Sequence, residues 1–284
     1  MAPPIQFGLT SWALPVPLTL AALLAAFLYL RGWLRLRSAS VQAIPGWRAT
    51  CFFVGLFLIW IALGSPLAAF DEELLTVHMV QHLLLMTIAP PLLLVGAPVM
   101  PFLHGLPRKV VQSVIGPLFR WPWMQRAGHA ISQPVVCWLA ATAALVGWHI
   151  PAAFTLALLH EPWHIVEHAC FLMGGILFWW PVVQPWPSAG SWPRWSTLIY
   201  LFLATLPCDI LSGFLVFCDR VIYPVYLSMP RQFSISVLAD QECAAALMWS
   251  CVTIVYLVPA MILATRLLAP RSAHADNSRQ SISL

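Results

Sequence analysis

Two apolar stretches of the sequence carry histidines at intervals of four residues. The first, TVHMVQHLLLMTIAPP, contains His78 and His82, and the second, LLHEPWHIVEHACF, contains His160, His164 and His168. Residues four apart on a helix stack on one face about 6 Å apart, close enough for two imidazoles to bind one metal ion. Imidazole is a ligand for copper, zinc and iron alike, so the spacing predicts a transition-metal site.

The elements that must position these histidines are membrane helices. The chain has 284 residues, of which 61% are hydrophobic and 8% charged, and its mean hydropathy is +0.83. A soluble domain of this size needs a more charged surface, so the composition predicts an integral membrane protein. The opening residues MAPPIQFGLTSW lack the basic segment of a cleavable signal peptide. The first apolar stretch is therefore expected to be retained as a span.

The predicted fold is an all-α polytopic membrane protein with seven transmembrane helices in one domain, residues 1–266. Each predicted helix is long enough to cross about 30 Å of hydrocarbon. The seven windows lie near residues 12–30, 49–66, 74–97, 132–150, 162–183, 195–218 and 240–265. Residues 98–131, which contain several prolines and tryptophans, are expected to form a surface linker. Residues 267–284 are polar and are expected to be a disordered tail.

The distribution of basic residues predicts the orientation of these helices. Twelve of the fourteen Lys and Arg residues fall on one set of connections, and only Arg220 and Arg231 fall on the other. Cytoplasmic loops retain Lys and Arg. The N-terminus is therefore predicted to lie outside, with the linker 98–131 and the C-terminus in the cytoplasm.

In this orientation six histidines share one level in the outer third of the membrane: His78, His82, His149, His160, His164 and His168. A polar side chain in hydrocarbon is costly, and its default interpretation is a functional site. A hydrogen bond to a neighbouring helix explains one such histidine equally well, but six at one depth favour a shared metal site. Glu167 and Asp240 are expected to accept hydrogen bonds from ligating imidazoles and so orient them.

Other polar and sulfur-containing residues of the spans are less informative. Met79 and Met86 are potential soft ligands for reduced copper, but their spacing from His78 favours core or lipid contacts. The seven cysteines form no CxxC pair and are expected to pack as small apolar residues. Asp209, beside Pro207 near mid-membrane, either satisfies freed backbone groups or binds a proton. The inner halves of the helices offer few further ligands, which argues against a conduction path for copper.

Several motifs, in this order, resemble the CtaG family of cytochrome c oxidase assembly factors: HMVQHLLL, APPLLLVGAP, WHIP, HIVEH with GILFWWPVV, YPVY and DQECAAALMW. The resemblance runs from about Pro66 to Trp249. It places these residues at the family's motif positions: His78, His82, His149, His164, His168, Glu167 and Asp240. The chain departs from the family pattern at Cys243, Ala244 and Ala245, where glycines are common.

The resemblance implies a multi-pass protein of the bacterial inner membrane that helps haem-copper oxidases mature, for which copper delivery is the usual suggestion. The implied partners are oxidase subunits, the lipid bilayer and a periplasmic copper carrier. Our hypothesis is that the six histidines bind one copper ion and hand it to, or hold it for, an oxidase subunit. The chain is expected to be an assembly factor rather than an enzyme, with no nucleic-acid partner.

Two alternatives stay open from the sequence. HxxxH and HEPWHIVEH loosely resemble the histidine boxes of membrane di-iron desaturases and hydroxylases, although those enzymes usually place their histidines on the cytoplasmic side. The second alternative is a b-type haem protein, in which His82 and His168 on facing helices would clamp one haem.

Overall fold

The computed structural model describes residues 14–39, 44–184, 193–229 and 233–269. Within these ranges the chain is helical and contains no strand, as predicted. Most of the predicted tail, and the first residues of the first predicted span, lie outside the described residues, as do Arg231, Arg271 and Arg279.

In the part of the chain that the structure describes, six helical segments, here called rods, are long and apolar enough to cross a membrane. They are α1 (Val16–Ala39), α2 (Gly46–Gly64), the rod of α3 (Leu75–Leu83), η3 (Leu84–Ile88) and α4 (Ala89–Val95), α11 (Glu161–Val183), α12 (Arg194–Phe217) and α14 (Val237–Leu268). A bent pair, α8 (Pro122–Ile131) and α9 (Pro134–Trp148), meets at 67° and makes up to seven spans. The sequence predicts seven spans, which agrees with the structure if this bent pair counts as one span.

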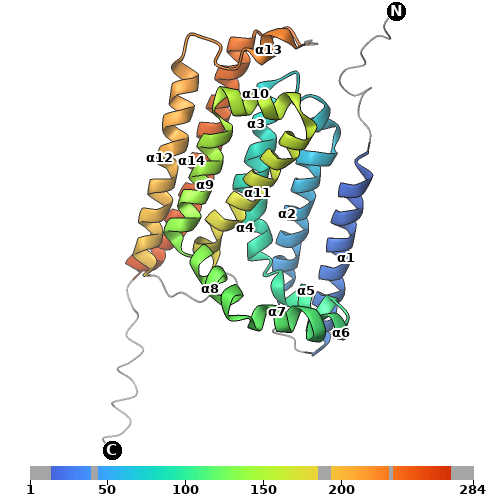
Figure 1. Ribbon diagram of the computed structural model, residues 1–284. Helices are drawn as coiled ribbons and strands as arrows, with labels where there is room; N and C mark the ends of the chain where they lie inside the picture. Colours follow the sequence, from blue (N-terminus) through green and yellow to red (C-terminus); the bar gives the residue numbers. More distant parts are fainter. Residues whose placement is uncertain (1–13, 40–43, 185–192, 230–232, 270–284) are drawn as a thin grey trace, which may run out of the picture.

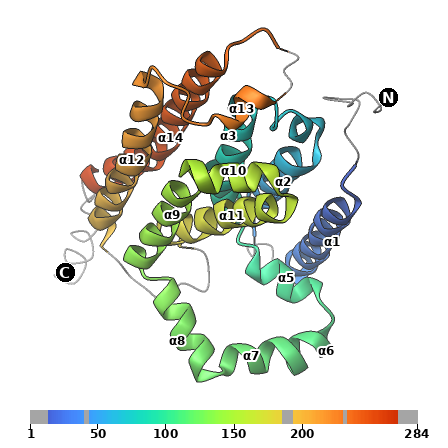
Figure 2. The ribbon, with the colours of Figure 1, turned by 45° about the horizontal axis from the view of Figure 1, so that its top comes forward.

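The rods form one bundle (Figure 1). The α3–α4 rod and α11 lie in its middle, with α1 and α2 on one side and α12 and α14 on the other, an arrangement that Figure 2 shows from a second direction. The large core cluster joins buried residues of the middle rods to α12 and α14. The buried faces of the middle rods therefore lie against protein, whereas α11 also has an exposed face that includes Ile165 and Met173.

The α3–α4 rod contains a π-turn at η3, where the Ala89 N–H donates to the Leu84 carbonyl. Pro90 and Pro91 follow directly, and prolines have no N–H to continue the regular helical ladder. Gly175 of α11 packs against this turn, because a Cβ added there would lie 2.5 Å from the Met86 carbonyl oxygen. The wide turn and the glycine together allow close approach of the two middle rods.

Shorter helices cross one end of the bundle, shown at the top of Figure 1. These are η2 (Pro66–Ala69), α10 (Pro151–Leu159) and α13 (Val225–Ser228). The sequence analysis predicts no helix between the spans at 132–150 and 162–183, so α10 is an addition. It closes this end of the bundle over α11.

The opposite end carries the segment predicted to be a linker, which folds into short helices: α5 (Val99–Gly105), α6 (Arg108–Val110), η4 (Val111–Ile115), α7 (Gly116–Arg120) and α8. Exposed basic residues gather at this end, namely Arg35, Arg37, Arg48, Arg108, Lys109, Arg120, Arg126 and Arg266. Acidic residues gather at the other: Asp71, Glu72, Glu73, Glu161, Asp219, Asp240 and Glu242. The two ends of the bundle thus differ sharply in charge.

Candidate metal centre

Five of the six predicted histidines converge at the acidic end. On the α3 and α11 rods, the ring centroids of His78 and His82 are 4.3 Å apart, and those of His164 and His168 are 4.2 Å apart. The two pairs face each other, with 5.4 Å between His78 and His164 and 5.7 Å between His82 and His168. Four-residue spacing on two helices therefore builds the cluster, as expected from the sequence.

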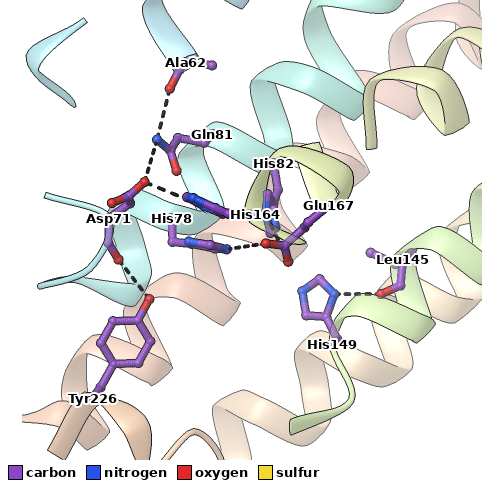
Figure 3. A network of polar contacts seen from close by, with 10 residues as sticks. All are labelled: Ala62, Asp71, His78, Gln81, His82, Leu145, His149, His164, Glu167 and Tyr226. Atoms are coloured by element: carbon purple, nitrogen blue, oxygen red, sulfur yellow. Dashed lines mark hydrogen bonds and ion pairs between the residues drawn. The ribbon is translucent and has the colours of Figure 1, made fainter. Parts of the chain in front are cut away.

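The carboxylate of Glu167 faces both histidines of α3 (Figure 3). Its Oε2 is 3.6 Å from His78 Nε2, and its Oε1 is 3.6 Å from His82 Nε2. These three residues are buried and offer ligand atoms within 4.8 Å of one another. The sequence analysis gives Glu167 the role of orienting an imidazole, whereas this geometry makes it a candidate ligand itself.

Asp71 supplies a second carboxylate that the sequence analysis did not include. Its Oδ2 is 3.8 Å from His164 Nε2, and Asp71, His78 and His164 form a second group of candidate ligands. Gln81 donates to Asp71 Oδ2 at 3.2 Å and to the Ala62 carbonyl at 3.0 Å. The sequence signal that could have identified Asp71 is its place in the acidic trio 71–73, just before the span that carries His78 and His82.

Burial changes the protonation of this carboxylate. Asp71 lies in the loop before α3, outside the spans, and desolvation raises the pKa of its carboxyl to about 7 despite the hydrogen bond from Gln81. A bound cation would favour the ionised form again. A positively charged partner near Asp71 would therefore stabilise its ionised carboxylate.

His149 completes the cluster from the end of α9. Its ring centroid is 6.2 Å from that of His82. Its Nδ1 is 2.7 Å from the Leu145 carbonyl oxygen, which fixes the tautomer because the carbonyl accepts only from Nδ1–H. The lone pair therefore lies on Nε2, the nitrogen that would bind a metal. We call the following set the histidine centre: Asp71, His78, His82, His149, His164, Glu167 and His168.

His160 does not join this set. Its side chain is exposed, and its backbone, with φ −134° and ψ 104°, precedes α11 in an extended conformation. Among the described residues no ring contact links it to the other five histidines. Four-residue spacing stacks side chains only inside a helix, and here the helix begins one residue too late.

The buried polar atoms of the histidine centre fit a cation. The buried atoms without a hydrogen-bond partner include both ring nitrogens of His78 and of His82, Nε2 of His149, His164 and His168, and both carboxylate oxygens of Glu167. Such an atom costs about 1–3 kcal/mol when it has no partner. Each neutral imidazole has one nitrogen with a free lone pair, and these nitrogens together with the carboxylate oxygens form a set of ligand atoms that can bind a metal ion in a buried place.

Aromatic side chains enclose the histidine centre. Phe171 stacks on His82 with 4.0 Å between ring centroids, and Phe154 of α10 lies 5.0 Å from His78. These rings exclude water and lower the local dielectric, which strengthens any electrostatic interaction inside. The helix that the sequence did not predict thus supplies part of the wall.

Comparison with known protein families identifies the cytochrome c oxidase caa3 assembly factors over residues 27–269, most of the chain. The chain belongs to this family. It is also 24% identical to uncharacterized proteins of Mycobacterium bovis and Mycobacterium tuberculosis over 288 residues, which cover 97% of this chain and 43% of each relative. No solved structure matches the chain.

A third relative, an uncharacterized protein of Mycobacterium leprae, is 24% identical over 247 residues, covering 85% of this chain and 37% of its own length. The chain therefore spans less than half the length of these curated relatives. The resemblance to CtaG proteins drawn from the sequence is confirmed by the family match.

Motif residues of this family member hold the histidine centre in place. The YPVY tyrosines are both buried, with Tyr223 donating to the His149 carbonyl at 3.0 Å and Tyr226 to the Asp71 carbonyl at 2.9 Å. From the sequence, YPVY is only a motif of the family resemblance. In the structure, Tyr223 just before α13 and Tyr226 within α13 both reach the histidine centre.

Asp240 ties α14 to the start of α3. Its carboxylate accepts hydrogen bonds from the backbone N–H groups of Leu75 at 2.8 Å and Thr76 at 3.1 Å, and from the Thr76 hydroxyl at 2.7 Å. These bonds satisfy donors of the first turn and place a negative charge at the positive end of the helix. Asp240 thus fixes the helix that carries His78 and His82, and a bond to an imidazole stays a prediction.

The residues after Asp240 also pack closely. Gln241 accepts from the Ile222 N–H at 2.8 Å and donates to the carbonyl oxygens of Leu215 and Arg220, so it fastens the loop after α12. Ala244 and Ala245, at two of the three positions where glycines are common in the family, are both fully buried. Alanine is small enough for α14 to pack into the core here.

Proposed function

We propose that this chain carries a copper ion as cargo in its histidine centre and delivers it to, or holds it for, a subunit of a haem-copper cytochrome c oxidase. One observation carries the proposal. Two candidate ligand groups, the buried His78–His82–Glu167 and the largely buried Asp71–His78–His164, overlap at His78. Family membership supplies the oxidase as the client.

Charge and ligand type support a divalent copper ion. Burying a cation in a low-dielectric site is costly unless negative groups compensate it. Asp71 and Glu167 offer two negative charges, which match one divalent ion. Imidazole and carboxylate ligands bind such an ion without the closed thiolate cage of a structural site, so the ion can exchange with a recipient.

The proposed orientation places the histidine centre on the extracytoplasmic side. Exposed Lys and Arg gather at the opposite end of the bundle, and cytoplasmic ends retain such residues. A periplasmic copper carrier would then reach the acidic end without crossing the membrane. The oxidase recipient would meet the chain within the bilayer of the bacterial inner membrane.

Metal titration of the full chain in detergent tests the proposal. Wild-type protein is expected to bind Cu(II), while His82→Ala and His164→Ala each weaken binding at least tenfold. The matched control is His129→Ala, because His129 is exposed on α8 at the other end of the bundle. Equal affinity of wild type and both site variants would overturn the proposal.

A second candidate is a di-iron enzyme of the desaturase or hydroxylase type. The observation in its favour is the same overlap, since two carboxylates and a shared histidine can also hold two ions. Elemental analysis separates the candidates, because two irons per chain would favour the enzyme and copper without iron the assembly role.

The b-type haem has less support, because the cavity beside His82 and His149 measures about 40 Å³, against about 300–1,000 Å³ for ligand pockets.

A further inference from the structure

A cavity of about 40 Å³ adjoins the histidine centre toward the middle of the bundle. His82 and His149 line it, together with side chains from η3, α11, α12 and α14. Met86, which also lines it, is eleven residues beyond Leu75 and thus roughly 16 Å along the rod, near the middle of a bilayer. A void of this size has room for one ion or one water molecule.

Four sulfur-containing side chains line this cavity: Met79, Met86, Cys208 and Met248. All four are buried, and they come from three separate rods. Thioethers and thiols are soft ligands that favour monovalent copper and related ions. The four side chains come from segments far apart in the sequence, and they line one cavity.

Methionine and cysteine also serve as ordinary core residues, so the sulfur atoms alone decide nothing. The deciding observation is that imidazoles with free nitrogens line the same cavity. The Nδ1 of His149 is engaged by the Leu145 carbonyl, while its Nε2 is buried without a hydrogen-bond partner. The Nδ1 of His82 likewise has no hydrogen-bond partner, whereas its Nε2 lies 3.6 Å from Glu167 Oε1. A plain hydrophobic void would not present bare nitrogen lone pairs.

The charge of the cavity differs from that of the histidine centre. The centre contains the carboxylates Asp71 and Glu167, whereas the residues that line the cavity include no Asp or Glu. Among the lining residues, Cys208 and Tyr256 have a group that can ionise to a negative charge, and a thiol is the stronger acid of the two. The cost of burying an ion grows with the square of its charge in the Born description, so this environment favours a monovalent ion.

We propose that this cavity is a second metal site, for a soft monovalent ion of the Cu(I) type. Its ligands are drawn from Met79, Met86, Met248 and Cys208, with His82 or His149 at its boundary with the histidine centre. The proposal rests on the proposed function only for the identity of the metal as copper. The cavity would be a site for a monovalent ion beside the histidine centre, which would bind a divalent ion.

Silver(I) is the probe that tests this site, because it is soft, monovalent and stable in air. The full chain in detergent is titrated with Ag(I) and, separately, with Cu(II). Met86→Leu/Met248→Leu keeps side-chain volume and is expected to weaken Ag(I) binding at least tenfold while Cu(II) binding stays within twofold. The matched control is Met173→Leu/Met261→Leu, which changes two methionines that are 54% and 57% exposed.

The variant Glu167→Gln separates this proposal from the proposed function. It is expected to lose Cu(II) binding and to keep Ag(I) binding. If wild type fails to bind Cu(II) while Ag(I) binding still depends on Met86 and Met248, the cargo role of the histidine centre fails and the sulfur site stands. Unchanged Ag(I) affinity in Met86→Leu/Met248→Leu overturns the sulfur site.

X-ray absorption of the wild-type protein loaded with one equivalent of Ag(I) gives a readout that does not depend on folding of a variant. Sulfur neighbours around silver are expected. A shell of nitrogen and oxygen alone would overturn the proposal, because the ion would then sit in the histidine centre. Cys208→Ser, tested in the same way, is expected to reduce the sulfur contribution.

Discussion

The two ends of the bundle differ in whether they contain buried charged side chains. At the acidic end, Asp71, Glu167 and Asp240 are buried and point at other protein groups. At the basic end, Arg108, Lys109 and their neighbours are exposed on short helices. The three buried acids thus hold specific protein contacts, whereas the exposed basic residues carry the proposed orientation in the membrane.

The largest expected effect comes from neutralising a buried acid and comparing it with an exposed one on the same helix. Glu167→Gln is expected to weaken Cu(II) binding at least about 100-fold, since it removes a ligand that lies between two imidazoles. Glu161→Gln, at the exposed first turn of α11, is expected to leave affinity within twofold. Isothermal titration measures both, and equal losses would contradict the distinction between buried and exposed charge.

A second comparison tests whether the acidic end depends on close packing below it. Gly175→Ala would push a Cβ to 2.5 Å from the Met86 carbonyl oxygen, and we expect a loss of about 1–3 kcal/mol in stability. The adjacent Gly174→Ala is the control, because its Cβ would lie 3.5 Å from Ala144 Cβ, an ordinary contact. Thermal unfolding in detergent measures both, and a similar melting temperature for the two variants would count against close packing here.

A third comparison uses two acids at the start of α14. Asp240→Ala removes the acceptor for the first N–H groups of α3 and is expected to cost about 1–2 kcal/mol. Glu242→Ala, two residues on and exposed, is expected to change stability by less than about 0.5 kcal/mol. Chemical denaturation measures the stability of both variants. An Asp240→Ala variant as stable as the wild type would show that this cap contributes nothing to stability.

The smallest effect on the metal centre is expected at the basic end. Arg108→Gln/Lys109→Gln is expected to leave Cu(II) affinity within twofold, because both side chains are exposed at the far end of the bundle. Fusion of a topology reporter to the C-terminus is expected to show a weaker cytoplasmic preference, since these residues bias orientation. A strong loss of metal binding would mean that the two ends are coupled.

The sequence predicted what depends on local chemistry. Hydropathy windows found the spans because each helix must be apolar along its own length, and four-residue spacing placed His78 beside His82 for the same local reason. α10 escaped prediction because its nine residues are apolar like the spans around it, and only length separates them.

Tertiary contacts explain the rest. Asp71 was missed because a loop carboxylate becomes a candidate ligand only when α11 brings His164 to it. His160 was included because its spacing matches the others, but spacing has no directional meaning before a helix begins. Asp240 bonds to a helix start 165 residues away in sequence, a distance over which periodicity carries no information.

The π-turn at Leu84–Ile88 sets the angular phase between the two halves of its rod. A helix turns by about 100° per residue, so the extra residue in this turn rotates everything below it by about that amount relative to an unbroken α-helix. Removing one residue there would leave His78 and His82 in place but turn Pro90 and Leu94 onto a different face. The number of residues in this segment therefore fixes which face of the rod meets α11.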